Sequence, residues 1–159
     1  MRITILTVGK VRERHLFDGI AEYRKRLGRF ATVHLLEVAE EPAPETLSTA
    51  EQAQVKAREA ERLRKGLRDG QYVIALDIAG GQMPSEAFAT YLQKVMLDGY
   101  SEIVFLIGGS LGLDEMLLRQ AHLRLSFGQM TFPHQLMRLI LVEQVYRAFT
   151  IMKGHPYHK

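Results

Sequence analysis

Short apolar runs rich in β-branched residues alternate along this chain with longer segments whose apolar residues recur at helical spacing. Residues 2–8 are β-branched and apolar enough for a buried strand, and residues 72–78 are nearly continuous in apolar residues, which is typical of a strand covered on both faces. The strand-like runs fall at residues 2–8, 32–38, 72–78, 102–107 and 123–127. This alternation predicts an α/β fold with a mostly parallel sheet and helices on both faces. No repeat or linker interrupts the pattern, so residues 1–159 are expected to form a single domain.

Boundary signals support helices between the runs. Apolar residues share one face of the segment that follows the first run, and Gly28 ends it. Ser48 and Glu51 have the spacing of a capping box, which opens a long charged helix. Two prolines within residues 40–45 exclude both a helix and a strand there. The residues expected to cap helix N-termini are Ser48, Ser85 and Asp114.

The segment from Pro133 to about Met152 is predicted to be a helix without a polar face. Proline suits the first turn, because the missing N–H has no intrahelical acceptor there. Its apolar residues point in nearly every direction, and the polar interruptions are Arg138, Glu143, Gln144 and Arg147. Such a helix must be buried on several sides. One domain of this size covers only part of that surface, so we expect a second copy of the chain to cover the rest in a homodimer.

Composition excludes several classes of protein. The sequence has no cysteine, which removes disulfides, zinc–thiolate sites and cysteine nucleophiles together. The apolar run at residues 3–8 is too short for a signal peptide or a membrane span, so we expect a cytoplasmic protein with no membrane partner. The histidines do not have the spacing of metal ligands on a common helix, so we expect no metal.

Basic residues are concentrated near the N-terminus. Seven of them fall within twenty residues against three acidic ones, and they are Lys10, Arg12, Arg14, Arg24, Lys25, Arg26 and Arg29. A clustered basic face suits a nucleic-acid backbone, because each neutralised phosphate releases counterions. A solvated helix face explains the same pattern equally well, and both interpretations stay open.

Three of the predicted strand ends carry glycines or small residues. They are residues 76–81, 107–112 and 127–132. Ligands of open parallel sheets bind at the carboxyl ends of strands, and glycine lets the backbone approach a ligand closely. Three such ends favour one shared pocket for a nucleoside-like ligand. No G-x-G-x-x-G or G-x-x-x-x-G-K-[ST] motif occurs, so a ligand without a pyrophosphate cradle, such as S-adenosylmethionine, fits best.

Particular sequence segments resemble a known family. They are FLIGGSLG at residues 105–112, LSF at 125–127 with MTFPH at 130–134, VEQVYRAF at 142–149 and HPYHK at 155–159. These look like the ribosomal RNA large subunit methyltransferase H family, a minimal branch of the SPOUT methyltransferases, and the likeness covers essentially the whole chain. It implies a C-terminal trefoil knot, a homodimer, and methylation by S-adenosylmethionine of the N3 nitrogen of a pseudouridine in 23S rRNA of the ribosome.

The resemblance also implies which residues bind the methyl donor. By position these are Leu76, Gly108, Phe127, Gly128, Gln129, Met130, Thr131 and Phe132. Gly128 and Gln129 stand where many members of the family have a Ser-Lys pair. Because such a loop binds mainly through its backbone, this departure leaves the assignment in place and leaves open whether a lysine there contacts RNA in other members.

Methyl transfer requires alignment of the reacting atoms and removal of a proton from a weakly acidic imide nitrogen. Of the candidate proton acceptors we favour His158, from a C-terminal tail that substrate orders and that reaches into the partner's pocket. Tyr157 is expected to stack on or hydrogen-bond the base, and Arg138 to hold a phosphate or a developing enolate oxygen. Other candidates are His134, Glu143 and His155 as bases, and Arg147 and Lys159 as phosphate ligands.

Structural and functional alternatives remain. Glu143 and Arg147 are four residues apart on one helix, so they also fit a simple ion pair, and His134 also fits a structural hydrogen bond. A non-catalytic ribosome-binding or assembly factor explains the basic segment and the aromatic tail without a small-molecule pocket. A nucleotide hydrolase is disfavoured, because the sequence has no phosphate-binding motif.

Overall fold

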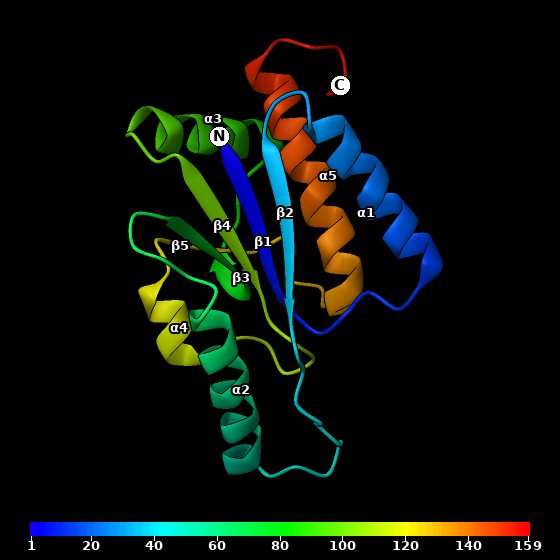
Figure 1. Ribbon diagram of the computed structural model, residues 1–159, viewed down its shortest axis with the longest axis vertical. Helices are drawn as coiled ribbons and strands as arrows, with labels where there is room; N and C mark the ends of the chain where they lie inside the picture. Colours follow the sequence, from blue (N-terminus) through cyan, green and yellow to red (C-terminus); the bar gives the residue numbers. More distant parts are fainter.

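The computed structural model describes residues 1–159, and strands and helices alternate along it (Figure 1). The strands are β1 (Arg2–Val8), β2 (Thr32–Val38), β3 (Tyr72–Gly81), β4 (Glu102–Ile107) and β5 (Leu123–Leu125). The helices are α1 (Arg14–Leu27), α2 (Thr49–Arg64), α3 (Ser85–Leu97), α4 (Glu115–Gln120) and α5 (His134–Met152). The expected order of elements is therefore confirmed.

The five strands form one sheet in the order β2-β1-β4-β3-β5, and every neighbouring pair is parallel. All carboxyl ends therefore lie at one edge of the sheet. The register between β3 and β5 shifts between Leu76 and Gly81, so the last part of β3 bends before Gly81 pairs with Leu125. This bend makes β3 longer than the predicted run, whereas β5 ends at Leu125, two residues earlier than predicted.

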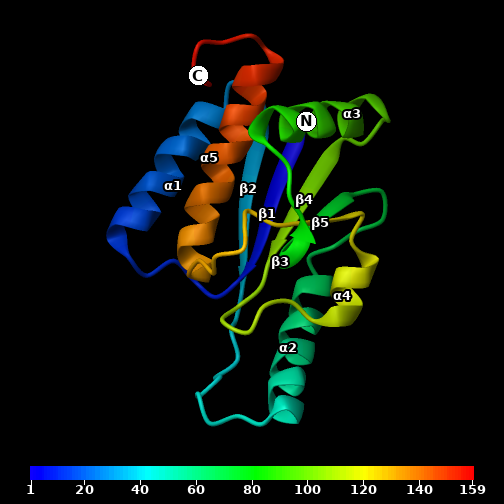
Figure 2. The ribbon, with the colours of Figure 1, turned by 180° about the vertical axis from the view of Figure 1, so that it is seen from behind.

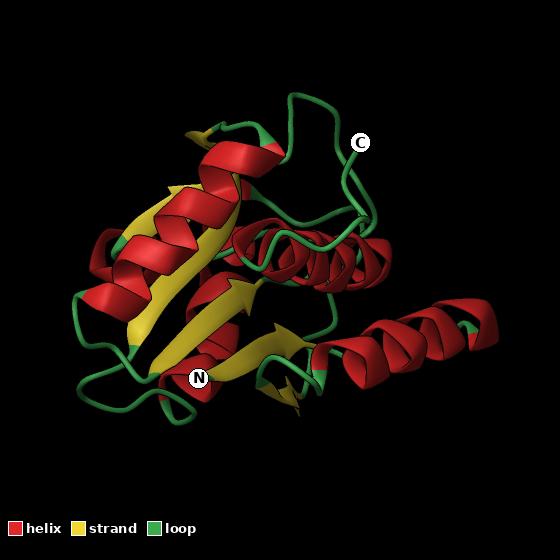
Figure 3. Ribbon diagram, turned by 90° about the horizontal axis from the view of Figure 1, so that it is seen from above, coloured by secondary structure: helices red, strands yellow, loops and turns green.

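Two hydrophobic layers cover the two faces of the sheet. Along β4, Ile103 and Phe105 pack in the layer with α1, α3 and α5. Val104 and Leu106 point to the other face, toward α2 and α4. Successive side chains of a strand point to opposite faces of the sheet. A strand that is apolar at every position is therefore buried on both faces. Figure 2 shows α2 and α4 grouped below the sheet and apart from α1 and α5, and Figure 3 shows the twisted sheet from above.

Helix starts follow the sequence signals at Ser48 and Asp114 but not at Ser85, and Pro133, expected in the first turn of α5, is instead its N-cap. The Ser48 hydroxyl accepts from the Glu51 N–H at 3.2 Å, and the Ser48 N–H donates to Glu51 Oε2 at 2.7 Å, which completes the capping box. Asp114 caps α4 through two backbone N–H groups, as predicted. The predicted cap at Ser85 is wrong. Pro84 is the N-cap of α3, and the Ser85 hydroxyl instead donates to Gln144 Oε1 of α5 at 2.8 Å.

Helix α5 lies between α1 and α3 and against the sheet. This position buries Leu141, Val142 and Val145 completely, as expected for a helix with apolar residues on several sides. The chain leaves β5, the outer strand on one side of the sheet. Arg138 of α5 already contacts β1 and β2, the two strands at the opposite side. The segment between them therefore crosses the carboxyl ends of the central strands.

No helix of the structure combines the length and apolar character needed to cross a bilayer. No group of three or more histidine, aspartate or glutamate side chains is arranged to hold a metal ion.

Candidate functional site

The three glycine-bearing strand ends meet in one cavity. It has a volume of about 490 Å³ and opens at the carboxyl edge of the sheet. Its walls come from the end of β3, from the loop between β4 and α4, and from the loop between β5 and α5. A cavity of this size fits an adenosine-sized ligand. The prediction of a shared pocket at these strand ends is therefore confirmed in its geometry.

Two glycines permit the loops to pack this closely. A Cβ atom on Gly108 would lie 2.5 Å from the carbonyl carbon of Gly112, and one on Gly80 would lie 2.6 Å from the carbonyl oxygen of Arg124. Both clashes are with backbone atoms, which have no rotamer that would relieve them. Glycine at these positions therefore brings the backbones of neighbouring loops together around the cavity.

The loop after β5 forms the third wall. Ser126 is buried, and its hydroxyl accepts from the Gly128 N–H at 3.1 Å and donates to the Gly128 carbonyl at 3.0 Å. Gly128 has φ +135°, a conformation that L side chains rarely adopt. The predicted donor-binding residues that line the cavity are Leu76, Gly108, Phe127, Gly128, Met130, Thr131 and Phe132. The exposed Gln129 is not among the lining residues.

Charged side chains at the cavity are balanced. Arg124 donates two hydrogen bonds to Asp77 Oδ2, from Nε at 3.0 Å and from Nη2 at 2.6 Å. Lys56 and Glu115 also line the cavity. Two cations thus face two carboxylates, which suits a ligand of low net charge better than a polyphosphate. Sequence reasoning missed Lys56 and Arg124, because no local motif marks them, although Asp77 lies near the end of the predicted run at residues 72–78.

His134, the first residue of α5, lines the cavity. Burial lowers the pKa of its imidazole, and the positive charge of Arg138 one turn later lowers it further. Both effects favour the neutral form of the ring. The sequence left two roles open for His134, a base or a structural residue, and the structure places it in the wall of the cavity.

Arg138 has no exposed surface. Its Nη1 donates to Glu37 Oε1 at 3.1 Å, and its Nη2 donates to the Val8 carbonyl at 2.7 Å. Burial lowers the pKa of this guanidinium, and the Glu37 carboxylate opposes that shift. Arg138 therefore ties the start of α5 to the ends of β1 and β2, and it does not line the cavity in this conformation.

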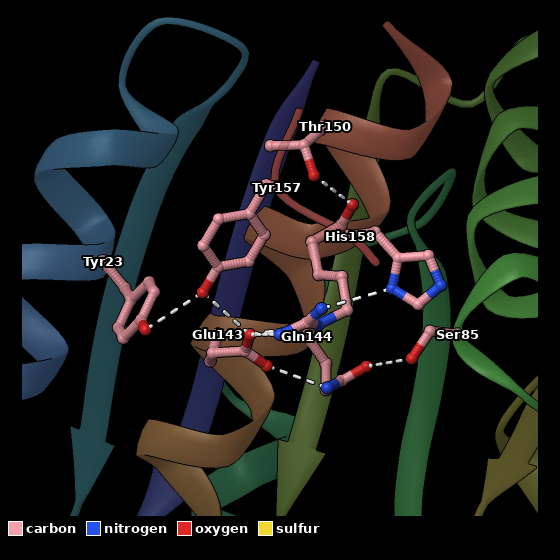
Figure 4. A network of polar contacts seen from close by, with 8 residues as sticks. Tyr23, Ser85, Glu143, Gln144, Thr150, Tyr157 and His158 are labelled. Carbon is pink, nitrogen blue, oxygen red and sulfur yellow. Dashed lines mark hydrogen bonds and ion pairs between the residues drawn. The ribbon is translucent and has the colours of Figure 1, made fainter. Parts of the chain in front are cut away.

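The C-terminal tail folds back onto α5. The Tyr157 hydroxyl donates to Glu143 Oε1 at 3.0 Å and lies 3.2 Å from the Tyr23 hydroxyl (Figure 4). Its ring packs edge-on against Tyr146 and beneath the Arg147 guanidinium. Burial, followed by these hydrogen bonds, raises the pKa of Tyr157 above its usual range. Tyr157 is therefore a hydrogen-bond donor rather than a base at neutral pH.

His158 lies between two helices. Its Nδ1 is 3.2 Å from Arg147 Nη1, and its Nε2 is 2.8 Å from Glu86 Oε1 at the start of α3. Because a guanidinium only donates, Nδ1 accepts and the ring proton is on Nε2. Arg147 also donates to Glu143, so the ion pair expected from their spacing is present. Lys159 is exposed.

The tail and the cavity do not meet directly within one chain. Glu143, which holds Tyr157, lies roughly 13 Å along the helix from His134. A smaller hollow of about 260 Å³ lies between them. Ser85 and Gln144 line this hollow on the side of the tail network, and Phe127 lines both the hollow and the main cavity. Neither Tyr157 nor His158 lines the main cavity or the smaller hollow.

Comparison with known families identifies the architecture around this cavity. The family model described as Predicted SPOUT methyltransferase matches residues 1–158. The chain belongs to the SPOUT methyltransferase family. The resemblance seen in the strand-end and C-terminal segments is therefore confirmed, and the cavity at the strand ends is the candidate methyl-donor site of a SPOUT enzyme.

Curated relatives match along their whole length. The Ribosomal RNA large subunit methyltransferase H of Leuconostoc citreum is 53% identical over 159 residues, and that of Ruminiclostridium cellulolyticum is 52% identical over 159 residues. The protein of the same name from Lacticaseibacillus casei is 54% identical over 159 residues. In each case the alignment covers 100% of both chains.

A solved structure shares the fold. It is described as a probable methylase family protein from Haemophilus influenzae Rd KW20, with a TM-score of 0.51 and 13% sequence identity. The match covers 99% of this chain and 70% of that one. At this identity the likeness extends to the fold alone.

Proposed function

We propose that this protein is an S-adenosylmethionine-dependent methyltransferase that methylates the N3 nitrogen of a pseudouridine in 23S rRNA on the ribosome. The observation that carries the proposal is the cavity at the carboxyl ends of β3, β4 and β5 in a chain that matches rRNA methyltransferases along its full length. An adenosine-sized, charge-balanced cavity is a feature that a scaffold protein does not need.

The residues around the cavity fit S-adenosylmethionine. Closely packed loop backbones offer N–H and C=O groups, and Leu76 and Phe127 offer apolar surface for a purine. The balanced charges of Asp77 and Arg124 leave no cradle for a polyphosphate. When bound, S-adenosylmethionine supplies a methyl group on a sulfonium that is already a good leaving group. The tasks left to the chain are to align the base and to help remove a proton.

We propose that the active unit is a homodimer with a C-terminal trefoil knot. The crossing of residues 126–133 over the strand ends supports the knot, because it passes the chain from one sheet edge toward the other. An isologous dimer with α5 helices antiparallel would bring the tail end of one helix near the cavity end of the other. Tyr157 and His158 would then complete the partner's site, which neither completes in its own chain.

Within that site we propose His158 as the proton acceptor or the group that orients the base. If His158 left its contacts with Glu86 and Arg147, both of its ring nitrogens would become free. The bound substrate would then provide new hydrogen-bond partners for them. Tyr157 would donate a hydrogen bond to the base or stack on it. For Arg138 the buried contacts to Glu37 and Val8 support a positioning role at the cavity end of α5.

The basic segment supports a ribosomal RNA partner. Arg24, Lys25 and Arg29 are exposed at the end of α1, whereas Arg14 and Arg26 are engaged by acidic residues one turn away. We propose that the exposed cations contact rRNA phosphates. An assembly factor that binds the ribosome without catalysis remains the second candidate, since the same cations would serve it.

A calorimetric titration and a methylation assay separate the two candidates. We expect the wild-type protein to bind S-adenosylhomocysteine, and to transfer labelled methyl from S-adenosylmethionine to ribosomes from cells that lack the protein. Mass mapping of the 23S rRNA should then find the methyl on N3 of a pseudouridine. Ribosome association without donor binding, in the free protein and with ribosomes present, would favour the assembly factor.

A further inference from the structure

Glu59 is a buried carboxyl group behind the donor cavity. It lies on α2, one turn after the cavity residue Lys56, and only 4% of its surface is exposed. Its Oε1 accepts from the Glu41 N–H at 3.1 Å. A Cβ atom on Gly109 would lie 3.1 Å from Glu59 Oε2 and 3.2 Å from Oε1. Glu59 therefore fills the space on the outer side of the loop between β4 and α4.

No basic side chain forms an ion pair with Glu59. The nearby Arg62 instead pairs with Glu41 and donates to the Ala39 carbonyl at 2.9 Å. Burial, and then the neighbouring Glu40 and Glu41, raise the pKa of Glu59, and the Glu41 N–H and Arg62 oppose the shift. Burying a carboxyl group without a cation is costly. A side chain at position 59 that served only for packing would not need a carboxyl group.

We propose that Glu59 is a positioning residue that holds the loop of residues 108–113 in its donor-binding conformation. The carboxyl group accepts a hydrogen bond from the Glu41 backbone and lies next to Gly109, and no strand pairing connects these two segments. Gly109 lines the donor cavity, and Glu59 stands directly behind it. Without this support the loop would sample wider conformations, and ordering it would subtract from donor affinity. The inference rests on the proposed donor site.

Replacing Glu59 tests the proposal by two readouts that need no turnover. We expect Glu59→Ala to weaken binding of S-adenosylhomocysteine about tenfold by calorimetry, since the loop then loses its preorganisation. Amide hydrogen exchange in residues 108–113 should accelerate in the ligand-free protein. Glu59→Gln keeps the shape and the acceptor for the Glu41 N–H, so its affinity should stay within about twofold of wild type.

Two controls separate positioning from general stability. Val55→Ala removes buried volume one turn before Glu59 on the same helix, and it should lower the melting temperature without changing affinity. Glu61→Ala removes an exposed carboxylate from α2 and should change neither property. The proposal would be overturned if Val55→Ala and Glu59→Ala both lost donor affinity in proportion to their loss of melting temperature.

A double-mutant cycle tests the contact itself. Gly109→Ala places a methyl group against the Glu59 carboxyl, so it should weaken donor binding in the wild type and weaken it less in the Glu59→Ala background. Additive effects of the two substitutions on donor affinity would overturn the proposal. It would also be overturned if Glu59→Ala bound S-adenosylhomocysteine as tightly as the wild type and showed the same amide hydrogen exchange in residues 108–113. If the wild type itself fails to bind S-adenosylhomocysteine, the proposed function falls together with this inference. Normal wild-type binding with no effect of Glu59→Ala removes the inference alone.

Discussion

At the scale of single residues, adjacent glycines with the same sequence signal have different roles. Gly80 and Gly81 both end β3. A Cβ atom on Gly80 would overlap the Arg124 backbone, whereas the nearest atom to one on Gly81 is 3.9 Å away. The pair therefore offers a test in which the chemical change is identical and only the surroundings differ.

Gly80→Ala should destabilise the fold by about 1–3 kcal/mol, because β3 and β5 must separate to admit the methyl group. Gly81→Ala should change the free energy of unfolding by less than about 0.5 kcal/mol, since its methyl group makes only ordinary contacts. Urea denaturation of both variants measures the difference. Equal effects of the two substitutions would contradict the close approach of these strands.

Glu59 predicts a pH dependence of stability. Its pKa is raised in the folded protein, so folding favours the protonated form, and stability is lost as pH rises through the folded pKa. Glu59→Gln has no proton to lose. The melting temperature of the wild type should therefore fall relative to that of Glu59→Gln as the pH rises above the ordinary range of a carboxyl group, about pH 4. A constant gap across this rise in pH would show that Glu59 has an ordinary pKa.

At the scale of elements, α5 and the tail that follows it combine two roles. Helix α5 packs in the hydrophobic core on one side and carries the polar network of Glu143 and Arg147 on the other. The sequence predicted a mobile tail, because terminal polar residues usually lack contacts. In the structure Tyr157 and His158 are instead held by α1, α3 and α5. The tail is thus docked, through contacts that a substrate would have to replace.

Deleting residues 157–159 should abolish methyl transfer while leaving donor binding and dimer mass nearly unchanged. The ion pair of Glu143 and Arg147 is made within α5 and survives the deletion. Labelled methyl transfer, calorimetry and light scattering measure the three properties. Loss of folding in the shortened chain would show instead that the tail is structural.

The end of α1 gives a prediction about RNA. Replacing Arg24, Lys25 and Arg26 with alanine should weaken ribosome association, because fewer rRNA phosphates are then neutralised. The slope of log K against log salt should become less steep by about one for each phosphate that the variant no longer neutralises. Association measured at several salt concentrations gives the slope.

A matched control removes the same charge elsewhere. Arg58, Lys65 and Arg68 are exposed on and just after α2, on the other side of the sheet, and their replacement with alanine should leave the slope unchanged. An unchanged slope in the α1 variant, or an equal change in both variants, would refute a specific basic face.

At the scale of the whole molecule, the cavity and the tail belong to different parts of one chain. The cavity opens at the carboxyl edge of the sheet, whereas the C-terminus lies near the amino edge (Figure 1). A site built from the cavity of one copy and the tail of another would bring the two together. Such a shared site leads to a prediction that a site within one chain does not.

Mixed dimers should recover activity from two inactive proteins. One variant lacks residues 157–159, and the other carries Leu76→Arg, which fills the donor cavity. After random exchange of subunits, about half of the dimers are mixed and each has one complete site, so about a quarter of wild-type activity should return. Methyl transfer before and after refolding the mixture measures it. No recovery, despite mixed dimers detected by native mass spectrometry, would place the tail and the cavity of one site in the same chain.

The fold was predictable to the extent that local rules applied. The apolar runs of β1 and β4, the capping box at Ser48 and the glycine-bearing strand ends are short-range signals, and the structure contains each of them. Ser85 was predicted wrongly, because Pro84 already supplies the extended conformation of a cap and the Ser85 hydroxyl has a partner on α5. That partner is 59 residues away, beyond any local pattern.

The sequence by itself determined the layered α/β class and the segments that would border a ligand, because alternation and glycine placement act over a few residues. Only the tertiary structure decided that Lys56 and Arg124 share the cavity, that Arg138 is buried on β1 and β2, and that Glu59 stands behind Gly109. These arrangements depend on strand order and crossover paths. The physical reason is that contacts between residues distant in the chain are selected by the packing of whole elements, which leaves no periodic trace in the sequence.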